Sequence, residues 1–336
     1  MLDEGKYEYL NGGTKASGTW NEFNVNGKTI TISEGGNSCG YVNFMKEKFW
    51  CGAHCYYLFD VKCKPKYLYY LLKGNQSNLM KLRSGACMPN IKKSDLGNFK
   101  FIYDSDVIHQ DKIISIFDNL TNVIYFYEKQ IKYFDNLVKA RFIEMFGSIH
   151  DSKIFVYYPL KEITTVCSGG TPNRDNKAYW ESGTIPWVKT TELKNNRLTH
   201  VEEFITELGL EESSAKLVPS DTVLIAMYGQ GKTRGMTGYL EIEATTNQAC
   251  ACILPTNKMN MIYLWKYFEL SYDKLRELAK GGNQPNLNCT MIRDFNILVP
   301  PIELQNQYAD FVRHVDKSRF DIKKSIIELE REVVYD

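Results

Sequence analysis

Glycine-rich loops with amide and cationic side chains are the part of this sequence best suited to chemistry. One loop, YGQGKTRG, runs from Tyr228 to Gly235, and another, EGGNSCG, from Glu34 to Gly40. Asn and Gln can pair bidentately with adenine, Arg and Lys with guanine, and small residues let a backbone approach phosphates. The loops and their neighbours therefore predict DNA contacts by Asn37, Ser38, Asn90, Lys92, Lys189, Tyr228, Gln230, Lys232, Arg234, Asn247, Gln248, Asn283, Gln284 and Asn286.

A simpler interpretation of the same residues is turn formation. Gly and Asn are common in turns because they tolerate a positive φ, and for any single residue this explanation competes equally with DNA contact. The loops recur in both halves of the chain, however, and turn chemistry alone does not require that. For the loops as a group, recurrence favours a use in binding.

Other chemistries are not supported by the sequence. GQGKT resembles the end of a nucleotide-binding P-loop, but the first glycine of that motif would fall on Ala226. The five histidines stand outside any Ser-His-Asp arrangement, and no methyltransferase motif is present. Cys51, Cys55 and Cys63, with His54 among them, lack a CxxC pair, so we interpret them as buried thiols rather than a zinc site. The sequence predicts no catalytic residue and no metal.

The loops belong to a unit that occurs twice. An offset of 196 residues lays SGACMPNIKKSDLGNFKF (84–101) on KGGNQPNLNCTMIRDFNI (280–297) and pairs Asn90 with Asn286. The same offset pairs Gly35 with Gly231. Each copy is a globular α/β part followed by a long helix. Strands are expected at 28–33, 53–59, 221–227 and 249–254, and shorter helices near 66–72 and 261–280.

The long helices are predicted by apolar residues at a 3.5-residue spacing, which is typical of a helix that lies along another helix. The first covers about 109–146 and ends at Gly147; at 1.5 Å per residue it would be roughly 55 Å long. The second covers 302–336. The apolar positions form the helix seam: Ile113, Phe117, Leu120, Ile124, Ile131, Phe134 and Val138 in the first, and Tyr308, Val315, Ile322, Ile326 and Leu329 in the second.

Composition sets the remaining limits. The chain has 336 residues, a net charge of +1 and nine cysteines without a disulfide-type spacing, which indicates reduced thiols in a cytoplasm. No apolar run is long enough for a membrane span, and the first residues lack the features of a signal peptide. Residues 1–105 carry 14 Lys and Arg against 9 Asp and Glu, a bias compatible with phosphate contact.

Several separate motifs in this order resemble the specificity (S) subunit of type I restriction–modification systems. They are YLNGGTKASG (9–18), FDNLVKARFIEMFG (134–147), SGGTPNRDNKAYWESGTIPWVKTTEL (168–193), TTNQACACI (245–253) and FNILVPPIELQNQYADF (295–311). The resemblance covers nearly the whole chain. It implies an α/β (α+β) fold: two target-recognition domains separated by two long antiparallel coiled-coil helices, related as a pseudo-two-fold repeat.

The resemblance also implies domain limits and a function. Target-recognition domains are expected at 1–105 and 151–300, with spacer helices at 106–150 and 301–336. The first domain is expected to be short at its N-terminus, because about thirty residues that open the second half have no counterpart before Gly5. The chain would read a bipartite, asymmetric DNA target without catalysis of its own. An alternative is a truncated or silent copy that only docks partner subunits.

Partners and cofactors follow from the same resemblance. Double-stranded DNA, two methyltransferase (M) subunits and restriction (R) subunits are the expected partners, in the cytoplasm and away from membranes. The chain itself is expected to bind no cofactor. S-adenosylmethionine, ATP and Mg would be bound by the partner subunits, which would also flip the base and transfer the methyl group.

Overall fold

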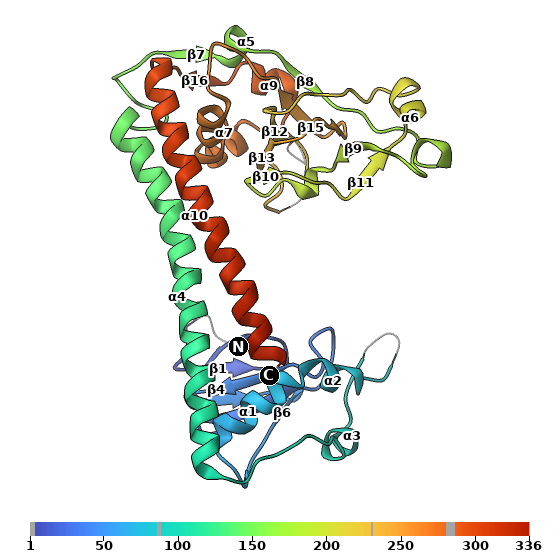
Figure 1. Cartoon of the computed structure of the whole chain (residues 1–336), viewed down its shortest axis with the longest axis vertical. Coiled ribbons are helices and arrows are strands. Elements are labelled where there is room, and N and C mark those ends of the chain that lie inside the picture. Colours follow the sequence, from blue (N-terminus) through green and yellow to red (C-terminus); the bar gives the residue numbers. More distant parts are fainter. Residues whose placement is uncertain (1–3, 86–88, 230, 280–285, 336) are drawn as a thin grey trace. The chain divides into compact units, whose positions relative to one another are not determined.

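The structure, a computed structural model, describes residues 4–85, 89–229, 231–279 and 286–335, and side chains as far as residue 331. It divides into two compact units. Unit 1 comprises Met1–Ile131 and Phe320–Asp336, and unit 2 comprises Lys132–Arg319. Two long helices, α4 (Val107–Phe146) and α10 (Ile302–Tyr335), contribute residues to both units (Figure 1).

Unit 1 contains two three-stranded sheets of order β2-β1-β5 and β4-β3-β6. The strands are β1 (Tyr7–Leu10), β2 (Gly18–Trp20), β3 (Thr29–Ser33), β4 (Val42–Met45), β5 (Phe49–Cys51) and β6 (Cys55–Tyr57). The short helices are α1 (Pro65–Gly74), α2 (Gln76–Lys81) and α3 (Lys93–Gly97). Proline begins α1, where its missing N–H and fixed φ are tolerated.

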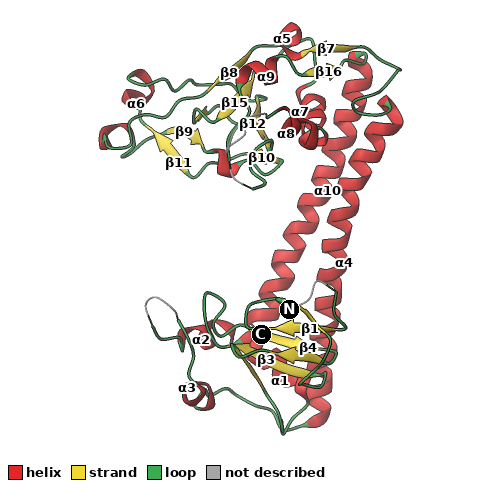
Figure 2. Ribbon diagram, turned by 180° about the vertical axis from the view of Figure 1, so that it is seen from behind, coloured by secondary structure: helices red, strands yellow, loops and turns green. Residues whose placement is uncertain are grey.

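Unit 2 is built around a five-stranded sheet of order β10-β13-β12-β15-β8, with a three-stranded sheet β11-β9-β14 and the pair β16-β7 (Figure 2). The strands are β7 (Tyr157–Pro159), β8 (Val166–Ser168), β9 (Ile185–Val188), β10 (Asn196–Leu198), β11 (Glu203–Ile205), β12 (Val223–Ala226), β13 (Thr237–Leu240), β14 (Thr245–Thr246), β15 (Cys250–Ile253) and β16 (Asn296–Leu298). The helices are α5 (Leu160–Ile163), α6 (Glu207–Glu211), α7 (Met261–Leu270), α8 (Tyr272–Leu278) and α9 (Cys289–Arg293), with the short 3₁₀ helices η1 (Lys177–Tyr179) and η2 (Thr190–Glu192).

The single helix expected at 261–280 is two helices. Ser271 separates α7 from α8: its hydroxyl donates to the Tyr267 carbonyl at 2.7 Å, and its N–H is shared between the carbonyls of Tyr267 and Phe268. A serine that bonds back to the preceding turn competes with the regular helix ladder. The end of the expected helix, Lys280, lies outside the described residues.

The two units share one strand plan. In unit 1, β3 pairs antiparallel with β4 and β6; in unit 2, β12 pairs antiparallel with β13 and β15, and β10 and β8 extend that sheet. The smaller sheets also agree. β1 pairs antiparallel with β2 and parallel with β5, as β9 does with β11 and β14. The expected α/β class with a repeated unit is confirmed.

The long helices pack antiparallel in unit 2, where they lie side by side (Figures 1 and 2). Tyr308 donates its hydroxyl to the Val138 carbonyl at 3.2 Å, and Arg319 reaches Asp135 at 2.6 Å. Phe142 is fully buried among Tyr263, Tyr308 and other rings, so both helices belong to the main core of unit 2.

Burial along the helices follows the 3.5-residue spacing. Val138, Tyr308 and Val315 are buried, and the other nine seam residues are half-buried between mostly exposed neighbours. In unit 1, Phe117 stacks on Tyr70 of α1 with ring centroids 5.0 Å apart. Part of the seam therefore contacts the globular part that precedes the helix.

Candidate nucleic-acid interface

Three segments of unit 2 meet at Met227, directly after β12. Its N–H donates to the Ala249 carbonyl at 2.8 Å, and its carbonyl accepts from the Leu287 N–H at 3.0 Å. The glycine loop that starts at Met227 closes where Gly235 donates to the Ala226 carbonyl at 2.9 Å. We call Met227, Ala249 and Leu287 the loop junction of unit 2, because it places the glycine loop beside the turn before β15 and the segment before α9.

Most predicted contacts of unit 2 surround this junction. Tyr228, Lys232, Gln248 and Asn286 are exposed, whereas Arg234 and Asn247 are half-buried. Gln230, Asn283 and Gln284 lie outside the described residues. The structure thus brings together six predicted side chains that come from three separate stretches of sequence.

The backbone of the glycine loop is hydrogen-bonded to two side chains of α8. The Tyr272 hydroxyl donates to the Lys232 carbonyl at 2.7 Å, and the Arg276 guanidinium donates to the Arg234 carbonyl at 2.9 Å. Because the backbone is fixed at both points, the side chain of Lys232 can extend into solvent from a defined position. Such preorganisation lowers the entropic cost of binding.

The turn before β15 presents two amide side chains with different hydrogen-bonding states. Thr171 donates its hydroxyl to Gln248 Oε1, which leaves the amide NH₂ of Gln248 as a donor. Within the described residues, Asn247 Oδ1 is buried and meets no donor. The exposed amide donor of Gln248 is the kind of group that a base edge can complement. Thr171 was missed as a site residue, although it stands in the SGGTP motif.

The charge of Lys189, another predicted contact, is paired with two acidic side chains. Its ammonium lies 2.8 Å from Glu202 and 2.9 Å from Glu203. These hydrogen bonds raise the pKa of Lys189. Arg174 pairs with Glu203 as well and lies over the ring of Trp180 at 3.7 Å. Lys189 therefore belongs to an ion cluster. The sequence could not reveal this pairing, because Glu202 and Glu203 lie more than ten residues from Lys189.

Unit 1 has an equivalent loop junction formed by Glu34, His54 and Ile91. Glu34 donates its N–H to the His54 carbonyl at 3.0 Å and accepts from the Ile91 N–H at 2.9 Å. Asn90 forms two hydrogen bonds with Ser84, of 2.9 and 3.0 Å. Of the predicted contacts, Asn37, Asn90 and Lys92 are exposed and Ser38 is half-buried. All four lie on the segments that this junction joins.

The hydrogen bonds correct the sequence pairing of the glycine loops. Gly36 and Gly231 both have positive φ, 73° and 62°, and a Cβ at either would meet open space. Gly40 and Gly235, with φ of 84° and 86°, close the two loops. Gly231 therefore corresponds to Gly36 rather than to Gly35. The junction residues His54 and Ala249 are also 195 positions apart, whereas Ile91 and Leu287 are 196 apart, so unit 2 has one more residue between these two segments.

With that pairing, the loop tips carry different side chains. Asn37 corresponds to Lys232, and Ser38 corresponds to Thr233. The backbone frame is shared while the groups that it presents are not. Loops that share a backbone arrangement but carry different side chains at their tips are suited to recognising two different surfaces.

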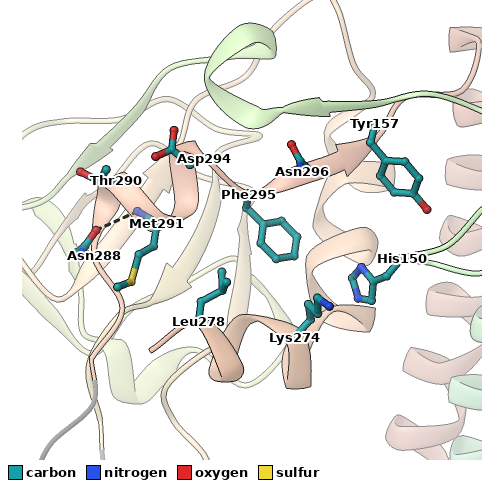
Figure 3. Close-up of a pocket in the computed structure, with 10 residues that line it drawn as sticks. All are labelled: His150, Tyr157, Lys274, Leu278, Asn288, Thr290, Met291, Asp294, Phe295 and Asn296. Carbon is teal, nitrogen blue, oxygen red and sulfur yellow. Dashed lines mark hydrogen bonds between the residues drawn. The ribbon is translucent and has the colours of Figure 1, made fainter. Parts of the chain in front are cut away.

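A cavity of about 760 Å³ in unit 2 offers no catalytic arrangement (Figure 3). His150, Lys274 and Asp294 line it together with Phe295. Burial, with the charge of Lys274, lowers the pKa of His150, and Asp294 is paired with Lys161 at 2.7 Å. No nucleophile stands beside a base among the described lining residues.

No metal-binding group of three or more His, Cys, Asp or Glu is present in the described part of the chain. Cys51 and Cys55 are buried, and Cys63 is half-buried. Among the described helices, none is long and apolar enough to cross a membrane.

Comparison with known proteins identifies the family to which this chain is similar. Residues 2–133 and 153–331 match the type I restriction modification DNA specificity domain. A relative from Mycoplasma genitalium, described as a type I specificity subunit, is 28% identical over 98% of this chain and 85% of its own length. One from Mycoplasma pneumoniae, described likewise, is 40% identical over 35% of this chain, a match that spans only 33% of that relative.

A solved structure has the same fold. The crystal structure of a type I restriction–modification S subunit from M. genitalium covers 99% of this chain and 87% of its own, with a TM-score of 0.59 at 22% identity. At that identity the likeness concerns the fold alone, and it agrees with the α/β architecture and long helices expected from the sequence.

Proposed function

The chain belongs to the type I restriction–modification DNA specificity family, and we propose that it reads a bipartite, asymmetric DNA target. Each unit would recognise one half-site, and catalysis would belong to other subunits. We assign recognition to 1–105 and 151–300, and spacing to 106–150 and 301–336.

The observation that carries this proposal is the pair of equivalent loop junctions. Each joins a glycine loop to a Pro-Asn-Ile or Pro-Asn-Leu segment by matching backbone hydrogen bonds. Exposed amide and cationic side chains surround both junctions, and these are the groups that read base edges and phosphates. Different side chains at corresponding positions favour different half-sites, and hence an asymmetric target.

Assembly with methyltransferase subunits is supported by an apolar stripe on α4. Ile116, Val123 and Phe126 in unit 1, and Tyr133 and Leu137 in unit 2, are each at least 39% exposed. Exposed apolar side chains that gather on one helix mark an interaction surface. We propose two M subunits as its occupants, with R subunits added for cleavage, in the cytoplasm. S-adenosylmethionine, ATP and Mg would be bound by those partners.

One observation favours the alternative of a docking-only copy. In unit 1, Tyr7, Tyr9, Trp20 and Trp50 share one face of the sheet β2-β1-β5, and all four are only half-buried. The equivalent face of unit 2 is covered, with Trp187 and Ile205 buried. Unit 1 therefore leaves partly exposed a sheet face that is buried in unit 2.

The test is target selection by the assembled complex. The chain is combined with its methyltransferase subunit and S-adenosylmethionine, and a random DNA library is methylated and sequenced at base resolution. We expect two different short motifs separated by an unread spacer of fixed length. An intact complex that methylates without sequence preference would instead support the docking-only protein.

A further inference from the structure

A buried glutamine occupies the fourth position of each long helix. Gln110 lies in α4 and Gln305 in α10, and each side chain is 1% exposed. A buried primary amide must find partners for its oxygen and its NH₂ group, because an unmet polar group in the interior is costly. Both glutamines form these hydrogen bonds with main-chain groups of the adjoining globular part.

The two sets of hydrogen bonds correspond one to one. Gln110 Oε1 accepts from the Lys64 N–H at 3.1 Å, and its Nε2 donates to the Asp104 carbonyl at 2.8 Å. Gln305 Oε1 accepts from the Asn260 N–H at 2.9 Å, and its Nε2 donates to the Pro300 carbonyl at 2.7 Å.

The partners of each glutamine come from two different elements. Lys64 and Asn260 are the N-cap residues of α1 and α7. Asp104 and Pro300 lie in the segments that lead into the long helices. Each amide therefore joins the start of a domain helix, the linker and the long helix at a single point.

We propose that Gln110 and Gln305 are positioning residues that fix the direction in which each recognition unit leaves its long helix, and so the length of DNA spacer that the chain accepts. The inference rests on the proposed function. A glutamine is suited to this role because one planar group holds a donor and an acceptor in fixed relative geometry. The loop junctions, which choose the bases, share no residue with this contact.

Two substitutions separate the amide's hydrogen bonds from its volume. Gln305→Met and Gln110→Met retain the length and the apolar stem of the side chain but leave a main-chain N–H and a main-chain carbonyl without a hydrogen bond.

Gln305→Glu keeps the acceptor for the Asn260 N–H but turns a carboxylate toward the Pro300 carbonyl. Burial raises the pKa of a carboxyl group, so the introduced side chain regains a donor as the pH falls through that raised value. Gln307→Glu, at an exposed position of the same helix, is the matched control.

The experiment is methylation of a library with both half-sites fixed and the spacer varied, by the full chain assembled with its methyltransferase subunit. We expect the Met variants to keep both half-site motifs while spacers one base pair longer or shorter gain about tenfold relative to wild type. Gln305→Glu should relax the spacer preference at pH 8 and recover it near pH 6, and Gln307→Glu should match wild type.

Two results would overturn the inference. Variants that melt earlier but keep the wild-type spacer preference would show that the glutamines contribute stability alone. If the wild-type complex itself showed no half-site selection, the proposed function and this role would both be refuted. That outcome is distinguishable from failure of the glutamine role alone, because it appears without any substitution.

Discussion

Units 1 and 2 share a backbone frame but differ in how completely it is covered. Both place a loop junction after the central strand of one sheet, and both attach to a long helix through a buried glutamine. In unit 2 the smaller sheet is closed by Trp180, Leu210 and Ala215, whereas in unit 1 the equivalent face shows half-buried aromatic rings. Hydrogen bonds that recur in both units identify the framework, and side chains that differ identify what each unit recognises.

The contacts between helix and globular part differ as well. Unit 2 uses a chain of charges from Glu241 through Arg197, Asp316 and Arg319 to Asp135. Unit 1 uses Asp118, which accepts from Lys66 at 2.6 Å and also from Tyr70, and a separate pair between Asp111 and Lys64. The charges of unit 2 form one continuous chain, which leads us to expect larger losses when it is cut.

The largest expected effect is at Phe142. Phe142→Ala removes a fully buried ring from contact with four aromatic neighbours and should lower the free energy of unfolding of unit 2 by about 3–5 kcal/mol. Phe117→Ala, which removes a half-buried ring stacked on one tyrosine, should cost unit 1 about 1–2 kcal/mol. Hydrogen exchange at rising urea concentration reports each unit separately. Equal losses would contradict the difference in packing.

A smaller effect is expected at Asp316, which accepts from both Arg197 and Arg319 at 3.0 Å with its side chain 15% exposed. Asp316→Asn leaves two partly buried guanidinium groups short of a counter-charge and should destabilise unit 2 by about 1–3 kcal/mol. Asp310→Asn is the control, because its pair with Arg313 is exposed and should contribute less than about 0.5 kcal/mol. Urea denaturation compares the two, and similar costs would refute the role of the charge chain.

The smallest expected effect concerns the thiol pairs of the two units. A hydrogen bond from Cys252, opposed by burial and supported by Lys216 and Arg293, lowers the pKa of Cys167 to about 6. Above that pH the half-buried thiol is mainly thiolate, so at pH 7 it should be alkylated about tenfold faster than an ordinary thiol.

The pair in unit 1 is the control for that measurement. Cys51 and Cys55 are both buried, and the hydrogen bond between them raises the pKa of Cys51 and lowers the pKa of Cys55. Timed iodoacetamide labelling with peptide mapping ranks the thiols. Because Cys55 is buried and Cys167 is half-buried, Cys167 should be labelled faster, and equal labelling of Cys55 and Cys167 would contradict the difference between the units.

The sequence was informative where a pattern repeats locally. The 3.5-residue spacing predicted both long helices, and the Pro-Asn segments paired Asn90 with Asn286 correctly. One extra residue of unit 2 between Ala249 and Leu287 displaced the pairing of Gly35, because an alignment with one fixed offset cannot absorb an insertion. The approach of Thr171 to Gln248 and of Lys189 to Glu202 depends on how distant strands pair, and no local spacing encodes that.

Assignment of half-sites by substitution tests the central claim most directly. Motifs are determined for the assembled wild-type complex, for Arg234→Ala with Gln248→Ala, and for Asn90→Ala with Lys92→Ala. We expect the first pair to relax one half-site by about 1–3 kcal/mol, the second pair to relax only the other, and the spacer to stay unchanged. Uniform weakening at both half-sites by either pair would contradict an account in which each unit reads its own half of the target.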